Sequence, residues 1–176
     1  MIHRDVTNKE NLFWSFHKSE SYGALHEDLI KLSGLIAQSG GNYPVGAVSD
    51  WKRAIVTAVA SHFGPIPHQR CLSHVLRLAK KLLPKNSPIE ATLKLREITL
   101  DLKNISDNNE KEQWQEEIAQ WEKQYGHLLK EKTVGLPENK KKWWYTHGNL
   151  RRAIRLLTKD QDNLFKFLPT SPTPDF

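Results

Sequence analysis

The chain of 176 residues contains a single cysteine, Cys71, so an intramolecular disulfide is excluded and a reducing compartment is expected. No stretch approaches the roughly 20 consecutive apolar residues that span a bilayer, and the first residues lack the apolar core of a signal peptide. The motifs of phosphate loops, dinucleotide-binding folds and Gly-x-Ser-x-Gly hydrolases are also absent. These absences predict a soluble, cytoplasmic protein without disulfides or membrane spans.

Positive charge is in modest excess, at a formal net of +6, and it is unevenly distributed. Residues 68–96 carry seven basic residues against one acid, and residues 136–168 carry eight against three. Between them, residues 101–132 hold eight acids against five bases. A solvated helix face is an equally good explanation for either basic segment alone. Two such segments in one chain favour a polyanionic partner, in particular nucleic acid.

Short strands alternate with helices in the first 70 residues. Apolar residues at spacings of four, three and four predict a helix that Gly40-Gly41 ends, and Gly64-Pro65 marks a second break. The expected elements are a strand at 12–17 after a polar turn, a helix at 25–36, a strand at 43–49, a helix at 54–63 and a short strand at 66–70. This order predicts an α/β fold.

Beyond Cys71 proline and glycine are sparse, and every segment is predicted to be helical. The clearest pattern is that of Trp114, Ile118, Trp121, Tyr125 and Leu128, which repeat at four, three, four and three. Further helices are expected at 72–83, 89–105, 150–157 and 160–168, followed by a proline-rich tail.

Asp50 and the pair Cys71 and His74 are the candidates for chemistry. Asp50 ends an apolar strand and opens a helix, where it serves either as a metal ligand or as a helix N-cap. Cys71 and His74 lie three residues apart at a helix start, but no second pair follows that would complete a zinc site. The thiol therefore acts as a nucleophile, as a metal or redox group, or simply as a small apolar side chain.

Aromatic and basic residues alternate near the C-terminal end. Trp143-Trp144-Tyr145 follows Lys140-Lys141-Lys142 and precedes three arginines. Rings that stack on bases and cations that neutralise phosphates suit nucleic acid, while helical core packing explains one or two of the rings equally well. The predicted nucleic-acid ligands are Arg70, Arg77, Lys80, Lys81, Lys140, Lys141, Lys142, Trp143, Trp144, Arg151, Arg152 and Arg155.

Five motifs follow one another along the chain: Ser19-Glu20-Ser21-Tyr22, Val48-Ser49-Asp50, Gln69-Arg70-Cys71-Leu72-Ser73-His74, the block from Trp143 to Arg152, and Asn163-Leu164-Phe165. In this order they resemble motifs of bacterial insertion-sequence transposases of the Mutator-like superfamily. The resemblance implies an RNase H-like catalytic fold with a helical insertion. It implies three catalytic carboxylates with two Mg²⁺ or Mn²⁺ ions for DNA strand cleavage and transfer.

By this resemblance Asp50 is the second catalytic aspartate and a metal ligand, while Cys71 and His74 support the fold near the site. The implied domains are a partial RNase H-like core at 1–83, an all-helical insertion at 84–136, C-terminal helices at 137–168 and a truncated tail at 169–176. The implied partner is DNA carrying the terminal inverted repeats of a mobile element, bound by a homodimer of the intact transposase.

Two of the three expected carboxylates have no counterpart. Asp5 occupies a hairpin-turn position instead of the first catalytic position, and no glutamate follows Glu138. The family's N-terminal DNA-binding helices are also missing from the sequence. We therefore expect an internal transposase fragment that is inactive alone and binds no metal tightly. The alternatives are a non-catalytic DNA-binding or regulatory remnant, and a helical protein that uses Cys71 and His74 as a metal or redox site.

Overall fold

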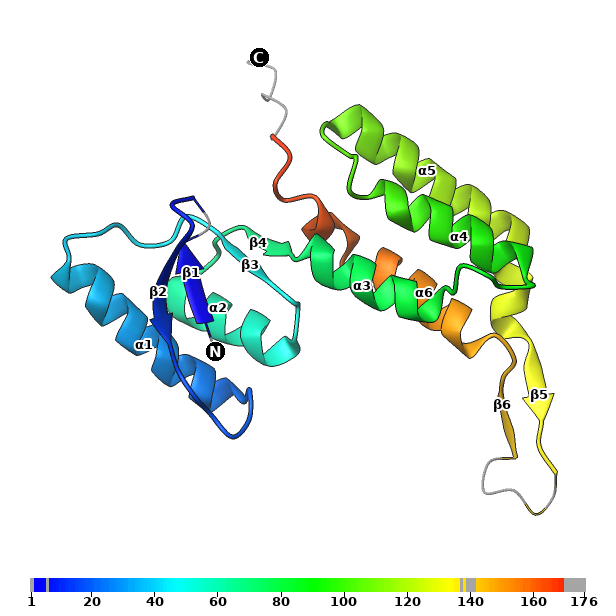
Figure 1. Ribbon diagram of the computed structural model, residues 1–176, viewed down its shortest axis with the longest axis horizontal. Coiled ribbons are helices and arrows are strands. Elements are labelled where there is room, and N and C mark those ends of the chain that lie inside the picture. The colour runs from blue at the N-terminus through cyan, green and yellow to red at the C-terminus, as the bar shows by residue number, and fades with distance from the viewer. Residues whose placement is uncertain (1, 6, 137, 139–141, 170–176) are drawn as a thin grey trace. The chain divides into compact units, whose positions relative to one another are not determined.

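The chain folds into two compact units, Met1–Arg70 and Cys71–Phe176. The computed structural model describes residues 2–5, 7–136, 138 and 142–169, and Figure 1 gives the order of the elements. In that part of the chain the strands pair two by two. No described helix is long and apolar enough to cross a membrane. Each unit has its own hydrophobic core.

The first unit combines an antiparallel hairpin, two helices and a parallel pair of strands. Its elements are β1 (Ile2–Asp5), β2 (Glu10–Trp14), α1 (Tyr22–Gln38), β3 (Ala47–Ser49), α2 (Arg53–Phe63) and β4 (His68–Arg70). Strand β1 pairs with β2 from Ile2 opposite Trp14 to Asp5 opposite Glu10. Strand β3 lies parallel to β4, with Ala47 opposite His68, and α2 connects the two as a crossover.

Local sequence explains where the two helices of the first unit begin and end. The hydroxyl of Ser21 caps α1 by accepting a hydrogen bond from the backbone N–H of Ala24. Glycines with positive φ follow both helices, Gly40 at 68° and Gly64 at 75°. Helices α1 and α2 pack on each other through a small core of Leu25, Leu29, Leu32, Ala58 and Val59.

The second unit is built mainly of helices, with one hairpin. Its elements are α3 (Leu72–Leu82), α4 (Glu90–Asp101), α5 (Asn108–Tyr125), η1 (Gly126–Lys130), β5 (Lys132–Val134), β6 (Trp143–Tyr145), α6 (Gly148–Thr158) and η2 (Gln161–Leu164). Helix α4 packs on both α3 and α5, and α6 packs on α3. Strand β5 pairs with β6 as an antiparallel hairpin that extends away from the helices (Figure 1).

The core of the second unit is large and lies between its helices. Leu83, Leu95, Leu102, Leu157 and Leu164 are completely buried. Two tryptophans of α5 also satisfy their ring N–H groups inside this core. Trp114 Nε1 donates to the Ile98 carbonyl at 2.8 Å, and Trp121 Nε1 donates to the Ala91 carbonyl at 2.9 Å. The acidic helix α5 is therefore held by its aromatic face.

The α/β class and the long helices follow the expectations from sequence. The all-helical prediction beyond Cys71 is wrong for β5 and β6, because Trp143-Trp144-Tyr145 forms a strand. A strand at 2–5 also precedes the expected turn. The two units divide after Arg70, and α3 packs in the second unit. The domain bounds expected from sequence place residues 72–83 in the core at 1–83 instead. The RNase H-like core and the insertion remain predictions.

Candidate functional site

Asp50 lies immediately after β3, at the carboxyl end of a strand in a parallel pair, as the sequence predicts. The chain turns sharply there, because Trp51 has a φ of 67°. Asp50 Oδ1 accepts a hydrogen bond from the backbone N–H of Lys52 at 3.2 Å. The N-cap residue of α2 is Lys52, without a side-chain capping bond, so the N-cap interpretation of Asp50 is wrong.

The carboxylate of Asp50 faces a lysine instead of other acids. Lys52 Nζ lies 3.4 Å from Asp50 Oδ2 and also pairs with Glu20. The hydrogen bond to Glu20 raises the pKa of Lys52 and, with the nearby charge of Asp50, outweighs the lowering effect of burial. A carboxylate oxygen is the donor that Mg²⁺ prefers, but the described residues contain no group of three His, Cys, Asp or Glu that could hold a metal.

Cys71 and His74 lie at the start of α3, in the second unit, three residues apart as predicted. Cys71 is the N-cap residue, its thiol is not in a disulfide, and it makes no side-chain capping bond. The backbone N–H of His74 donates to the Cys71 carbonyl at 3.1 Å. The buried His74 Nδ1 has no hydrogen-bond partner. Their supporting role in a catalytic site remains a prediction.

The exposed faces of α3 and α6 form a basic surface of the second unit, which we call the basic face. Together these two helices carry six basic residues and no acid: Arg77, Lys80, Lys81, Arg151, Arg152 and Arg155. Both helices are strongly amphipathic: their alanines and all their leucines except the exposed Leu78 turn inward, and most of their cations turn outward. All of these cations except Arg151 are exposed.

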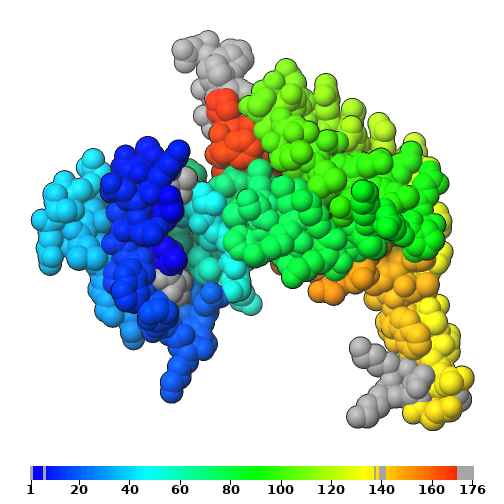
Figure 2. Space-filling view, viewed as in Figure 1, coloured from blue at the N-terminus to red at the C-terminus, as the bar shows by residue number. Residues whose placement is uncertain are grey.

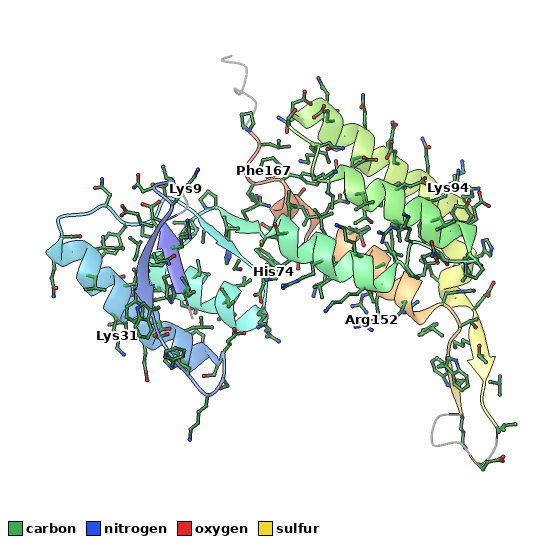
Figure 3. All side chains as sticks on the ribbon, in the orientation of Figure 1. Lys9, Lys31, His74, Lys94, Arg152 and Phe167 are labelled. Carbon is green, nitrogen blue, oxygen red and sulfur yellow. The ribbon has the colours of Figure 1, made fainter. Side chains whose placement is uncertain are left out.

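A groove joins the two helices across the basic face. It has a volume of about 430 Å³ and is lined by Leu78, Lys81, Leu82, Asn149, Arg152 and Leu156. Lys81 and Arg152 therefore lie on the same opening although about 70 residues of chain separate them. Arg152 extends on the side of the helices away from α5 (Figure 3). In the described part of the chain, no acid neutralises Arg77, Lys80, Lys81, Arg152 or Arg155.

The remaining predicted nucleic-acid ligands lie in three different settings. Arg70 is buried at the end of β4, so it is no surface ligand of phosphate as the sequence analysis expects. Arg151 donates to the Leu129 carbonyl at 3.0 Å and covers the Tyr145 ring at 4.0 Å. Lys142, Trp143 and Trp144 are exposed on the hairpin. Lys140 and Lys141 lie outside the described residues.

Asp28 forms a buried polar cluster that the sequence analysis misses. It is fully buried on α1 and accepts hydrogen bonds from Ser15 Oγ at 2.5 Å and from His17 Nε2 at 2.9 Å. His3 Nε2 approaches the same carboxylate at 3.5 Å. Burial raises the pKa of Asp28, but the hydrogen bonds from Ser15 and His17 outweigh it and hold the pKa below its usual value. The sequence does contain a signal of this cluster, because Asp28 is an acid at a position of α1 where the helical period places apolar residues.

Comparison with known proteins supports one family. A family model described as the IS66 family of transposases matches residues 57–174, about two thirds of the chain. No curated protein and no solved structure matches significantly. The match confirms the expectation of an insertion-sequence transposase and does not support the Mutator-like superfamily. The matched range includes Cys71, His74 and the basic face, and it begins after Asp50.

Proposed function

The chain belongs to the IS66 family of insertion-sequence transposases, and from this premise we propose that its second unit binds DNA through the basic face. The observation that carries the proposal is the pair of packed helices α3 and α6, with six cations and no acid. Exposed cations bind the phosphate backbone and release its counterions, independently of base sequence. Terminal inverted repeats as the target and a homodimeric transposase remain predictions.

DNA affinity at several salt concentrations tests the basic face directly. We expect residues 1–176 to bind a 30-base-pair duplex with log K falling by about 0.9 per phosphate contact for each tenfold rise in salt. Four to five contacts give a slope near −4. The quadruple variant Lys80→Gln, Lys81→Gln, Arg152→Gln, Arg155→Gln should make that slope shallower by about 3.6, which is about 0.9 for each cation removed. Gel-shift titrations between about 50 and 200 mM salt measure both quantities.

A charge-matched variant elsewhere serves as the control. The control variant removes the same number of exposed cations from outside α3 and α6, through the substitutions Lys9→Gln, Lys31→Gln, Lys94→Gln and Lys103→Gln. Its salt slope should stay within about one of the wild-type slope. Absence of binding by the wild type at about 50 mM salt would overturn the proposal. An equal loss in both variants would show that the basic face is not the binding surface.

We also propose that Asp50 is one catalytic carboxylate of an RNase H-like, Mg²⁺-dependent transposase. Its place at the end of β3 and its partly exposed carboxylate, 23% accessible, support this role. Two metal ions need several carboxylates, so the chain alone should not cleave DNA. The alternative is that the chain is a non-catalytic remnant that binds DNA through the same basic face. This alternative also predicts that the chain alone does not cleave DNA.

A cleavage assay distinguishes an active chain from an inactive one. Residues 1–176 are incubated with terminal-repeat DNA in Mg²⁺ or Mn²⁺, and denaturing gels detect nicked products. We expect no cleavage above the level of Asp50→Ala. Cleavage that the Asp50→Ala variant abolishes, with an exposed-acid control such as Glu27→Gln still active, would contradict the proposed inactivity and support Asp50 as catalytic.

A further inference from the structure

The hairpin of β5 and β6 presents two faces with different surroundings. Val134 lies opposite Trp143, Thr133 opposite Trp144, and Lys132 opposite Tyr145. Because side chains alternate along a strand, Trp143 and Tyr145 share one face and Trp144 lies on the other. The rings of Trp143 and Tyr145 meet at right angles with centroids 5.5 Å apart, which is consistent with this alternation.

The face with Trp143 and Tyr145 is engaged by cations of the same unit. Lys132 Nζ lies 4.3 Å from the centroid of the Trp143 ring, and the Arg151 guanidinium lies 4.0 Å from that of Tyr145. Since Arg151 also donates to the Leu129 carbonyl, it connects this face to α6 and to η1. These contacts fix the orientation of the hairpin where it leaves the helices.

Trp144, on the other face, is 42% exposed. Among the described residues, no aromatic ring or cation contacts its indole. Across the strands the Thr133 and Thr146 hydroxyls bond to each other at 2.9 Å, so the polar groups of this face satisfy each other. The hairpin stands out from the helical surface (Figure 2). A large aromatic side chain is thus held outward on a short, fixed strand, with one ring available for a partner.

Charge identifies the chemistry of that partner. Lys142 precedes the aromatic strand and is exposed, and Arg152 and Arg155 of the basic face follow in α6. Of the acids near the hairpin, Glu131 pairs with His147 at 3.1 Å and Glu138 is exposed. An exposed aromatic ring with cations on both sides of it in the sequence suits a nucleobase whose flanking phosphates bind those cations, since base stacking tolerates any sequence.

We propose that Trp144 stacks on an unpaired base of DNA, at a single-stranded end next to a duplex bound by the basic face. This inference rests on the proposed DNA binding and adds the kind of DNA end that the chain prefers. A base inside a duplex is already stacked on both sides, so the ring offers its contact only where the base pairing ends. The chain should therefore distinguish a duplex with an overhang from a blunt one.

The test compares two DNA molecules that share one duplex. One is blunt and the other carries a five-nucleotide overhang, and both are titrated with residues 1–176 at fixed salt. We expect about tenfold tighter binding to the overhang for one stacked base. Trp144→Leu should abolish that preference, while Trp144→Phe should retain most of it. A 2-aminopurine base in the overhang should lose fluorescence on binding to the wild type and not to Trp144→Leu.

The control is Trp14→Leu, which removes a tryptophan of the first unit that is 64% exposed. It should leave the overhang preference intact. Blunt-duplex binding without a preference for the overhang would overturn this inference and leave the basic face standing. No binding to either DNA would overturn the proposed function itself. If Trp144→Leu retains the preference for the overhang, the inference is overturned. If the same variant also converts a dimer to a monomer, the ring makes a protein contact instead.

Discussion

Asp28 occupies a position on α1 that the helical period reserves for an apolar residue, between Leu25 and Leu32. A charged carboxylate at such a position is costly unless hydrogen bonds compensate for its lost hydration. Ser15 and His17, which follow β2 in the chain, supply those bonds. One buried charge therefore ties the hairpin of the first unit to its first helix.

Replacing Asp28 should destabilise the first unit. We expect Asp28→Asn to lower the free energy of unfolding by about 3 kcal/mol at pH 7, because the amide cannot replace the charge that Ser15 and His17 hydrogen-bond. The pKa of Asp28 is depressed in the fold, so its stabilisation is present above about pH 4 and is lost as pH falls through the folded pKa. The difference between wild type and variant should shrink there.

Hydrogen exchange of the α1 amides measures this local stability at each pH. Glu27→Gln, an exposed neighbour on the same helix, is the matched control and should change the opening free energy by less than about 0.5 kcal/mol. A pH-independent difference for Asp28→Asn would show that the carboxylate contributes through its shape and not through its charge.

At the scale of elements, the sequence predicts well where apolar periodicity extends over several turns. Trp114, Ile118, Trp121 and Tyr125 all turn inward from α5, as their spacing requires. The hairpin could not be found in this way, because β5 and β6 have three residues each and no period can be counted over three residues. For Asp28 the sequence shows the unusual position, but its partners lie on another segment that only tertiary folding brings near.

The same limit applies to the candidate site. Asp50 could be placed at the end of a strand from the apolar run before it, and the cations of α3 and α6 from their amphipathic spacing. That Lys81 and Arg152 share one groove could not be predicted, since it depends on the packing of helices far apart in the chain. The burial of Arg70 could not be predicted either, because a basic residue in a short strand gives no signal of its burial.

The stability of helix α5 in its unit should depend on the hydrogen bond that Trp121 makes within the core. We expect Trp121→Phe to lower the free energy of unfolding of the second unit by about 2 kcal/mol, since the Ala91 carbonyl loses the hydrogen bond from the indole N–H and a small cavity remains. Trp121→Ala should cost about 4 kcal/mol. Urea denaturation followed by circular dichroism at 222 nm measures both, with the exposed Trp14→Phe as control. Equal losses for Phe and Ala would indicate that volume contributes nothing.

At the scale of the whole molecule, the two units differ in the size of their cores. The first unit buries a few aliphatic residues between α1 and α2, while the second buries leucines and aromatics from four helices. More apolar burial gives more stability per unit. We expect the slowest-exchanging amides of α4 and α5 to be protected at least tenfold more than those of α1 and α2. Hydrogen exchange with mass spectrometry on the full chain tests this, and equal protection would indicate one cooperative unit.

The packing of α3 against α6 also has a consequence for synthesis on the ribosome. About 65 residues separate the end of α3 from the start of α6, and at 5–20 residues per second their translation takes several seconds. Helix α4 can cover part of α3 as it emerges, but the side that α6 covers stays open until α6 follows. A nascent chain of this protein therefore offers an apolar helix surface to chaperones for that interval, until α6 covers it.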